Sequence, residues 1–291
     1  MSKFHSPVMI DEIVEYLRPT EGRKYIDATL GGGGHSKALV DRGGEVLGID
    51  QDPEAIDFVA ARTDLDQSRI IIIEENFENI SQVAKANEFD RVDGTLFDLG
   101  VSSYQFDKPE RGFSFQADAP LDMRMSPKLA VTAKDLVNGL GKKELYGLFT
   151  KLAQERFSRQ IADAIISARQ IKPIETTGEL ARIVSRVYAN RKTGLHPATK
   201  VFQSLRIAVN DEINILRSAL PLAFDLLKPG GRLIVISFHE GEDRVVKLLF
   251  KDLGQAGEGK VLSKKPLVPL ASEVADNPRS RSAKMRVVEK V

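Results

Sequence analysis

The chain has 291 residues, of which 42% are hydrophobic and 29% charged, and its formal net charge is +1. These values are typical of a globular protein, and no apolar run is long enough to span a bilayer. The absence of cysteine excludes disulfides, thiolate metal sites and a cysteine nucleophile. Four widely spaced histidines (His5, His35, His196 and His239) do not predict a metal site. Residues 1–7 lack the features of a secretory signal, so we expect a cytoplasmic protein with no membrane partner.

The first third of the chain alternates strand-like and helix-like segments. Residues 24–30 are strand-like and lead into four consecutive glycines, Gly31 to Gly34, which an amphipathic segment follows. The other segments of this alternation are strands at 45–50, 70–73 and 95–100 and helices at 35–41, 53–62 and 80–86. Such alternation indicates right-handed βαβ units, so we predict an α/β protein with a parallel sheet.

The alternation stops between about residues 108 and 210. A loop rich in Phe, Asp and Arg comes first, and the segments after it are short helices at 142–150, 155–169, 177–188 and 198–209. The α/β pattern then returns with helices at 211–227 and 242–253, a Lys-Pro-Gly-Gly stop at 228–231, and strands at 232–238, 261–267 and 284–289. We therefore predict one sheet domain, formed by residues 1–109 and 211–291, with a helical insertion at residues 110–210.

The glycine run is the clearest sign of a ligand. Glycines let the backbone approach a bound molecule, and the N–H groups at a helix start favour polar or anionic groups. Asp50 ends the second predicted strand, where an acid receives ribose hydroxyls in nucleotide-binding α/β folds. The dinucleotide pattern G-x-G-x-x-G fits in no frame of this glycine run. This argues against NAD as the ligand without excluding it. The alternative is that the glycine run only forms a tight turn between a strand and a helix and binds no ligand.

The ends of the next two strands add candidate residues. In open α/β sheets, ligands bind beyond the carboxyl ends of the strands, so these ends should converge. Phe77 is either an adenine contact or an ordinary core residue. Asp98 ends a buried strand, where a carboxylate is costly unless it has a partner, and this favours a functional role. The polar residues 102–105 follow at once.

Basic residues cluster in the predicted insertion. Residues 180–210 contain six of them and no acid, namely Arg182, Arg186, Arg191, Lys192, Lys200 and Arg206. The C-terminal tail adds Arg279, Arg281, Lys284 and Arg286. Such clusters suggest either a local surface for RNA or DNA or a solvated basic face. Phe113 and Phe115 are rings on which a base could stack, or anchors of a loop.

Many further segments follow one another along nearly the whole chain. They are His5–Val8, Asp27–Ser36, Asp98–Ser103 with Gln105, Arg111–Phe115, Pro120–Met125, His196–Thr199, Phe202–Ile207, Val209-Asn210, Ile236–His239, Glu242–Arg244 and Arg281–Lys284. In this order they resemble the bacterial 16S rRNA cytosine-N4 methyltransferases. The chain departs from the family pattern at Glu240-Gly241, where Ser-Leu is usual, and before Glu155, where a glycine is missing.

The resemblance implies a class I (Rossmann-like) methyltransferase that uses S-adenosylmethionine, with an inserted helical domain that helps bind a decoding-centre cytidine of 16S rRNA in the small ribosomal subunit. It implies the cofactor-binding residues Gly33, Gly34, His35, Asp50, Phe77, Asp98 and Gln105. We take Arg111, Phe113, Arg124, Arg206 and Asn210 as candidate substrate-binding residues. A homodimer is possible.

The absence of cysteine constrains the reaction as well, because methylation of cytosine at C5 generally uses a thiolate adduct, whereas methylation of the exocyclic N4 needs none. N4 is a weak nucleophile, so the site must orient it and accept hydrogen bonds from the NH2 group. Asp98 or a backbone carbonyl of residues 100–102 is our first candidate acceptor, and His239 is the second. The rival interpretations are a nicotinamide-dependent oxidoreductase, an RNA-binding assembly factor with a vestigial pocket, and a DNA amino-methyltransferase.

Overall fold

The computed structural model describes residues 7–189, 194 and 196–291, and it divides into two compact units. The first unit comprises the described residues up to Ser102 together with Ile213–Val291, and the second is Ser103–Glu212. The insertion expected at residues 110–210 begins later than the second unit, because the short helices α5 (Ser103–Asp107) and η3 (Pro109–Arg111) belong to that unit.

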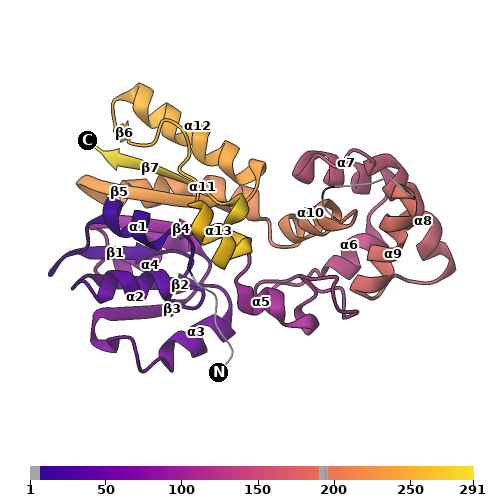
Figure 1. Ribbon diagram of the computed structural model, residues 1–291, viewed down its shortest axis with the longest axis horizontal. Coiled ribbons are helices and arrows are strands. Elements are labelled where there is room, and N and C mark those ends of the chain that lie inside the picture. The colour runs from indigo at the N-terminus through magenta and orange to yellow at the C-terminus, as the bar shows by residue number, and fades with distance from the viewer. Residues whose placement is uncertain (1–6, 190–193, 195) are drawn as a thin grey trace. The chain divides into compact units, whose positions relative to one another are not determined.

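A seven-stranded sheet forms the centre of the first unit (Figure 1), in the order β3-β2-β1-β4-β5-β7-β6. Strands β1 to β5 pair in parallel, whereas β7 runs antiparallel to β5 and β6. The order reverses between β1 and β4, and the crevice at such a switch point is where open α/β sheets bind ligands. The strands are β1 (Lys24–Asp27), β2 (Glu45–Asp50), β3 (Ile70–Glu74), β4 (Val92–Asp98), β5 (Leu227–Ser237), β6 (Gly259–Val261) and β7 (Lys284–Lys290).

Helices cover both faces of this sheet, because successive strand residues point to opposite faces and both sets are apolar. Ile26, Leu47 and Phe97 pack in one cluster with α4 (Ile80–Ala86), α11 (Glu212–Asp225) and α12 (Glu240–Ala256). Their strand neighbours pack in a second cluster with α1 (Ile10–Leu17), α2 (Gly34–Val40) and α3 (Pro53–Ala60). The smaller elements of this unit are α13 (Ala271–Asp276), η1 (Gln67–Arg69), η2 (Phe77–Asn79) and η4 (Pro278–Ser282).

One strand begins earlier than the sequence predicts. The Lys-Pro-Gly-Gly segment, expected to separate a helix from a strand at 232, lies inside β5. Val92 pairs with Leu227 and Gly94 with Arg232, so residues 228–231 form an irregularity in the ladder. Gly230 has φ +80°, a conformation that favours glycine. The strand expected at 261–267 is reduced to β6 and an isolated bridge between Leu267 and Met285.

The second unit is helical, as the sequence predicts for this region. Its longer helices are α6 (Ala133–Gly139), α7 (Lys142–Ala153), α8 (Ser158–Ile171), α9 (Thr177–Tyr188) and α10 (Thr199–Val209). Thr132 and Thr176 begin α6 and α9 with capping boxes. The core of the unit consists of apolar side chains from these helices, among them Val137, Leu145, Phe149, Ile161, Ile165, Leu180, Val184 and Leu205. No helix in the described part of the chain is long and apolar enough to cross a membrane.

Candidate active site

The glycine run forms a tight turn between β1 and α2 that other residues would not fit. Gly31 and Gly33 have φ of +49° and +70°, in the left-handed region. At Gly34 an added Cβ would lie 2.7 Å from Cγ of Pro7, and at Gly33 it would lie 3.0 Å from a methyl group of Val59. Both the conformation and the close packing therefore require glycine here.

Asp50, at the end of β2, holds this turn in place. Its Oδ2 accepts a hydrogen bond from the Gly31 N–H at 2.8 Å, and its Oδ1 accepts one from the Asp52 N–H at 2.9 Å. Arg62 donates to the Gly32 carbonyl at 2.6 Å from the other side of the turn. Burial raises the pKa of Asp50 to about 6, although these two backbone N–H groups act in the opposite direction.

Asp27 is a site residue that the sequence analysis missed. It ends β1 and is fully buried, and its Oδ2 accepts a hydrogen bond from the Ser36 hydroxyl at 2.7 Å. Its Oδ1 accepts from the Thr29 N–H at 3.2 Å, so the carboxylate joins the two ends of the glycine turn. Burial raises its pKa. The signal was present, since Asp27 ends a buried strand directly before glycines, as Asp98 ends another.

Asp98 lies at the end of β4, next to β1, and one of its carboxyl oxygens has no hydrogen-bond partner among the described residues. Its backbone N–H donates to the Thr29 hydroxyl at 2.6 Å, which fixes the strand end beside the glycine turn. Its Oδ1 is buried and accepts no hydrogen bond from the described residues. Burial raises its pKa to about 6. Such an acceptor at a switch point is available to a ligand or a substrate.

His35 follows the glycines on α2 and contacts Asp98. Its side chain is buried, with Nε2 at 2.9 Å from the carbonyl oxygen of Val8 and Nδ1 at 3.7 Å from Oδ2 of Asp98. The structure thus brings together four of the predicted cofactor residues, Gly33, Gly34, His35 and Asp98, with Asp50 behind the turn.

Phe77 lies in η2 after β3 and is half-buried. Its ring meets Phe97 of β4 edge to face, with centroids 5.4 Å apart. It therefore contributes to the core while keeping part of its surface exposed, and both interpretations of this residue are compatible with its position. Gln105, the remaining predicted cofactor residue, lies on α5 in the second unit with its side chain buried.

His239 caps a helix. Its Nδ1 accepts hydrogen bonds from the N–H groups of Gly241 and Glu242 at the start of α12, at 3.1 and 3.3 Å. Its Nε2 lies 3.2 Å from Oε1 of the buried Glu242, whose other oxygen accepts from the Phe238 N–H. These contacts give His239 a structural role, and its Nδ1 lone pair is already used.

In the second unit, the candidate substrate residues hold the loop at 112–132. Arg124 pairs with Asp122 at 2.8 Å and donates to the Leu129 carbonyl, and Arg111 donates to the carbonyls of Arg124 and Met125. These arginines therefore fix the loop through its own backbone.

Asn210 and Arg206, near the end of α10, are also engaged. Asn210 is buried, accepts from the Met125 N–H and donates to the Met123 carbonyl, each at 2.8 Å. Arg206 forms a bidentate ion pair with Glu212 at 2.8 and 2.9 Å.

The two phenylalanines of the loop pack inside the second unit. Phe113 is buried, and Phe115 stacks on His196 with centroids 4.5 Å apart and meets Phe202 edge to face. Their positions favour the interpretation that they anchor the loop.

The basic cluster is described only in part. Arg182 pairs with Asp118 at 3.8 Å, and Lys200 donates to the Gln154 carbonyl. Arg191 and Lys192 lie outside the described residues, as does His5 of the N-terminal motif.

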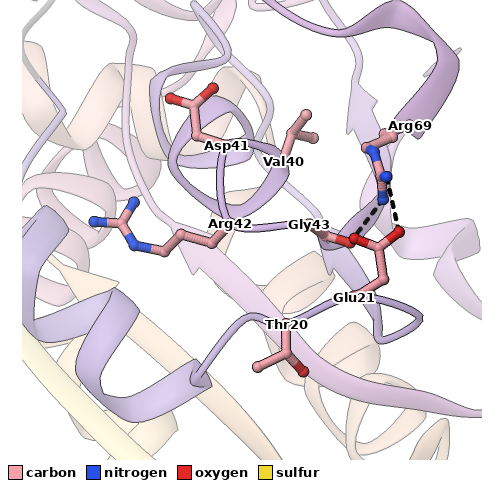
Figure 2. Close-up of a pocket in the computed structure, with 7 residues that line it drawn as sticks. All are labelled: Thr20, Glu21, Val40, Asp41, Arg42, Gly43 and Arg69. Carbon is pink, nitrogen blue, oxygen red and sulfur yellow. Dashed lines mark hydrogen bonds and ion pairs between the residues drawn. The ribbon is translucent and has the colours of Figure 1, made fainter.

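A pocket of about 520 Å³ lies at the opposite ends of the strands from the glycine turn (Figure 2). Glu21 precedes β1, Gly43 precedes β2 and Arg69 precedes β3, so the pocket lies at the amino ends of these strands. Arg69 bridges it by donating to Glu21 and to the Gly43 carbonyl. It contains none of the predicted site residues.

The strand order, the antiparallel β7 and the glycine turn after β1 are those of the class I methyltransferase fold. The profile of the MraW methylase family matches residues 2–291, and the chain belongs to this family. It is similar to proteins named ribosomal RNA small subunit methyltransferase H, being 48% identical to that of Deinococcus radiodurans, over 98% of this chain and 89% of the relative. It is 45% identical to that of Carboxydothermus hydrogenoformans, over 99% of this chain and 98% of the relative.

These matches confirm the family that the sequence motifs suggested and the prediction of S-adenosylmethionine as cofactor. The residues of the first unit fit that cofactor. The glycine turn has no room for side chains, Asp50 stands at the end of β2, and Asp98 presents a buried oxygen without a partner among the described residues.

Proposed function

We propose that this protein methylates the exocyclic N4 of a decoding-centre cytidine in 16S rRNA of the small ribosomal subunit. The observation that carries the proposal is the buried Oδ1 of Asp98, which has no hydrogen-bond partner in the described part of the chain and lies beside the glycine turn at the switch point of the sheet. The names of the relatives support RNA of the small subunit as the substrate.

We assign the binding of the cofactor to residues of the first unit, and Gln105 of the second unit stays a candidate that the family resemblance implies. S-adenosylmethionine supplies a methyl group activated by its sulfonium. The backbone of Gly33, Gly34 and His35 would approach it closely, the carboxylate of Asp50 would accept its ribose hydroxyls, and the exposed side of Phe77 would lie against its adenine. In this scheme Asp50 acts twice, because the same carboxylate also holds the turn.

In this proposal Asp98 is the acceptor for the substrate amine. The lone pair of N4 is conjugated with the ring, so N4 must pyramidalise as the new bond forms. A carboxylate oxygen that accepts a hydrogen bond from the NH2 group favours this change and helps to hold N4 in line with the methyl group. His239 is a weaker candidate for this role because its Nδ1 caps α12.

We propose that the second unit binds the target RNA through the loop that its arginines hold. Arg111 and Arg124 shape this loop, and Phe113 and Asn210 anchor it. Arg206 would have to leave Glu212 before it could bind a phosphate. The base must leave its stack to reach a methyl donor, so a rigid loop is a suitable support for it.

The experiment that tests this proposal uses radiolabelled S-adenosylmethionine, the purified protein and 30S subunits that lack the modification, followed by nucleoside analysis. We expect label in N4-methylcytidine from 16S rRNA. Label in another nucleoside would overturn the assignment of N4. Binding of S-adenosylhomocysteine but not NAD would reject the oxidoreductase, and RNA binding without cofactor binding would favour an assembly factor. Transfer to DNA and not to rRNA would favour a DNA amino-methyltransferase.

A further inference from the structure

The side chain of His35 is placed between a backbone carbonyl and a carboxyl group. Nε2 lies 2.9 Å from the carbonyl oxygen of Val8, and Nδ1 lies 3.7 Å from Oδ2 of Asp98. The imidazole is buried, and the Asp98 side chain is only 17% exposed. Water therefore screens this pair much less than it screens a surface pair.

The Val8 carbonyl determines which nitrogen of the His35 ring must carry a hydrogen. A carbonyl oxygen can only accept, so Nε2 of His35 must carry a hydrogen. Nδ1 then has one of two states. Either it is protonated and faces an ionised Asp98, or its lone pair faces the carboxyl group, which is unfavourable unless Asp98 itself carries the proton. Both favourable states carry one proton on the pair, either on Nδ1 or on the carboxyl group of Asp98.

The acidic groups around Asp98 determine how strongly the protonation of the His35–Asp98 pair matters. Asp27 and Glu242 also act on Asp98, and both disfavour its ionised form. His35 opposes them, and it acts in the same direction on Asp27. An imidazolium at this position thus favours the carboxylate form of Asp98 in a buried site that contains other acids.

We propose that His35 is a positioning residue for methyl transfer, which keeps Asp98 ionised and turns its Oδ1 toward the substrate amine. This proposal rests on the proposed function in assigning the amine to Oδ1, but the pairing of His35 with Asp98 does not. The Val8 carbonyl takes part because it fixes the imidazole tautomer and orientation. This explains why a segment before the first helix belongs to the site, since Val8 is fully buried and Pro7 packs on Gly34.

Two variants separate the roles of the two ring nitrogens. His35→Gln keeps an N–H donor near the position of Nε2, so the bond to Val8 can persist, but it cannot carry a positive charge. His35→Asn places its amide near the position of Nδ1, where it can donate to Asp98, and loses the bond to Val8. A purely structural role of His35 predicts that Gln is tolerated and Asn is not.

The first measurement uses the cofactor-free protein, labelled with 13C at the aspartate carboxyl groups. The Asp98 signal is assigned by its loss in Asp98→Asn and followed with pH. We expect its midpoint near pH 6 in the native protein and higher by about 1–3 units in His35→Gln. A midpoint that stays unchanged in a folded His35→Gln protein would overturn the proposal. If that variant does not fold, His35→Asn is titrated instead; its amide can still donate to Asp98 but carries no charge, so we expect a smaller rise, and a midpoint at or below the native value would overturn the proposal.

The second measurement is the pH profile of kcat with saturating cofactor and 30S subunits. We expect its acidic limb to move to higher pH in His35→Gln, with kcat recovering toward the native value as the pH rises. A uniform loss at every pH would contradict the assigned role. Because the carboxyl titration needs no substrate, it can succeed even if the assignment of N4 fails, and the two outcomes are distinguishable.

Discussion

The polar groups at the glycine turn and those in the loop at 112–132 are satisfied to different degrees. Arg124 in the loop and Arg206 near the end of α10 each donate two hydrogen bonds to one carboxylate. At the turn, by contrast, Asp98 retains a buried oxygen without a partner among the described residues. Unsatisfied buried groups are costly, so they persist where a ligand completes them. We therefore propose that the turn carries the chemistry and that the paired arginines support the loop.

The largest expected effect comes from removing the charge of Asp98. Asp98→Asn keeps the size of the side chain but weakens the acceptor at the strand end. We expect kcat to fall by about 10²–10⁴-fold, measured in single turnovers with saturating cofactor and 30S subunits. Cofactor affinity, measured by calorimetry, shows whether the residue also contacts the methyl donor. Unchanged turnover together with unchanged affinity would remove Asp98 from both roles.

The rigidity of the turn can be tested at Gly34. In Gly34→Ala, the new Cβ would lie 2.7 Å from Cγ of Pro7, so either the N-terminal segment or the turn must move. We expect a loss of about 1–3 kcal/mol in unfolding free energy and weaker cofactor binding.

Gly254→Ala is the matched control for this change. Gly254 lies inside α12 of the same unit, where an added Cβ meets its nearest neighbour at 3.5 Å. It should be neutral or stabilising by up to about 1 kcal/mol. Equal effects of the two substitutions in denaturant titrations would mean that the contact with Pro7 is not tight.

The glycine turn and the loop at 112–132 also differ in how far the sequence alone predicts them. The parallel strands β1 to β4 were predictable because their sequences are largely apolar, and the positions of Asp50 and Asp98 at the ends of such strands follow from the same pattern. The partners of the arginines were not predictable, because a charge cluster does not reveal them. Asp122 and Glu212 lie close in sequence to Arg124 and Arg206, but only the folded loop shows that they pair.

Breaking the ion pair between Arg206 and Glu212 should have a smaller effect. The two side chains are 17% and 11% exposed, so breaking the pair leaves a poorly solvated charge. We expect Arg206→Ala and Glu212→Ala each to lower the unfolding free energy by about 1–3 kcal/mol.

RNA binding separates the two possible roles of Arg206. If the pair only supports the unit, both variants weaken binding of 30S subunits to a similar degree in filter binding. If Arg206 also contacts RNA, as the sequence suggested, Arg206→Ala weakens RNA binding more than Glu212→Ala does, and cofactor affinity stays unchanged in both. A loss of cofactor affinity equal to the loss of RNA binding would contradict both alternatives and indicate misfolding.

The smallest expected effect is a pH dependence of stability that comes from Asp50. Burial raises the pKa of its carboxyl group from 3.8 to about 6 in the folded protein, so between these values the folded state binds more protons than the unfolded state. Stability therefore falls as the pH rises through this window, and the contribution of the neutral acid is lost above about pH 6. A shift of about two units corresponds to at most about 3 kcal/mol, which partial access of water reduces to about 1 kcal/mol.

Asp50→Asn isolates this contribution, because the amide can still accept from the Gly31 N–H but does not titrate. We expect the difference in unfolding free energy between the native protein and Asp50→Asn to change by about 1 kcal/mol between pH 4 and pH 7, in the cofactor-free protein. The native protein should become relatively less stable as the pH rises. The opposite slope would mean that the hydrogen bonds from the Gly31 and Asp52 N–H groups stabilise the carboxylate more than burial destabilises it.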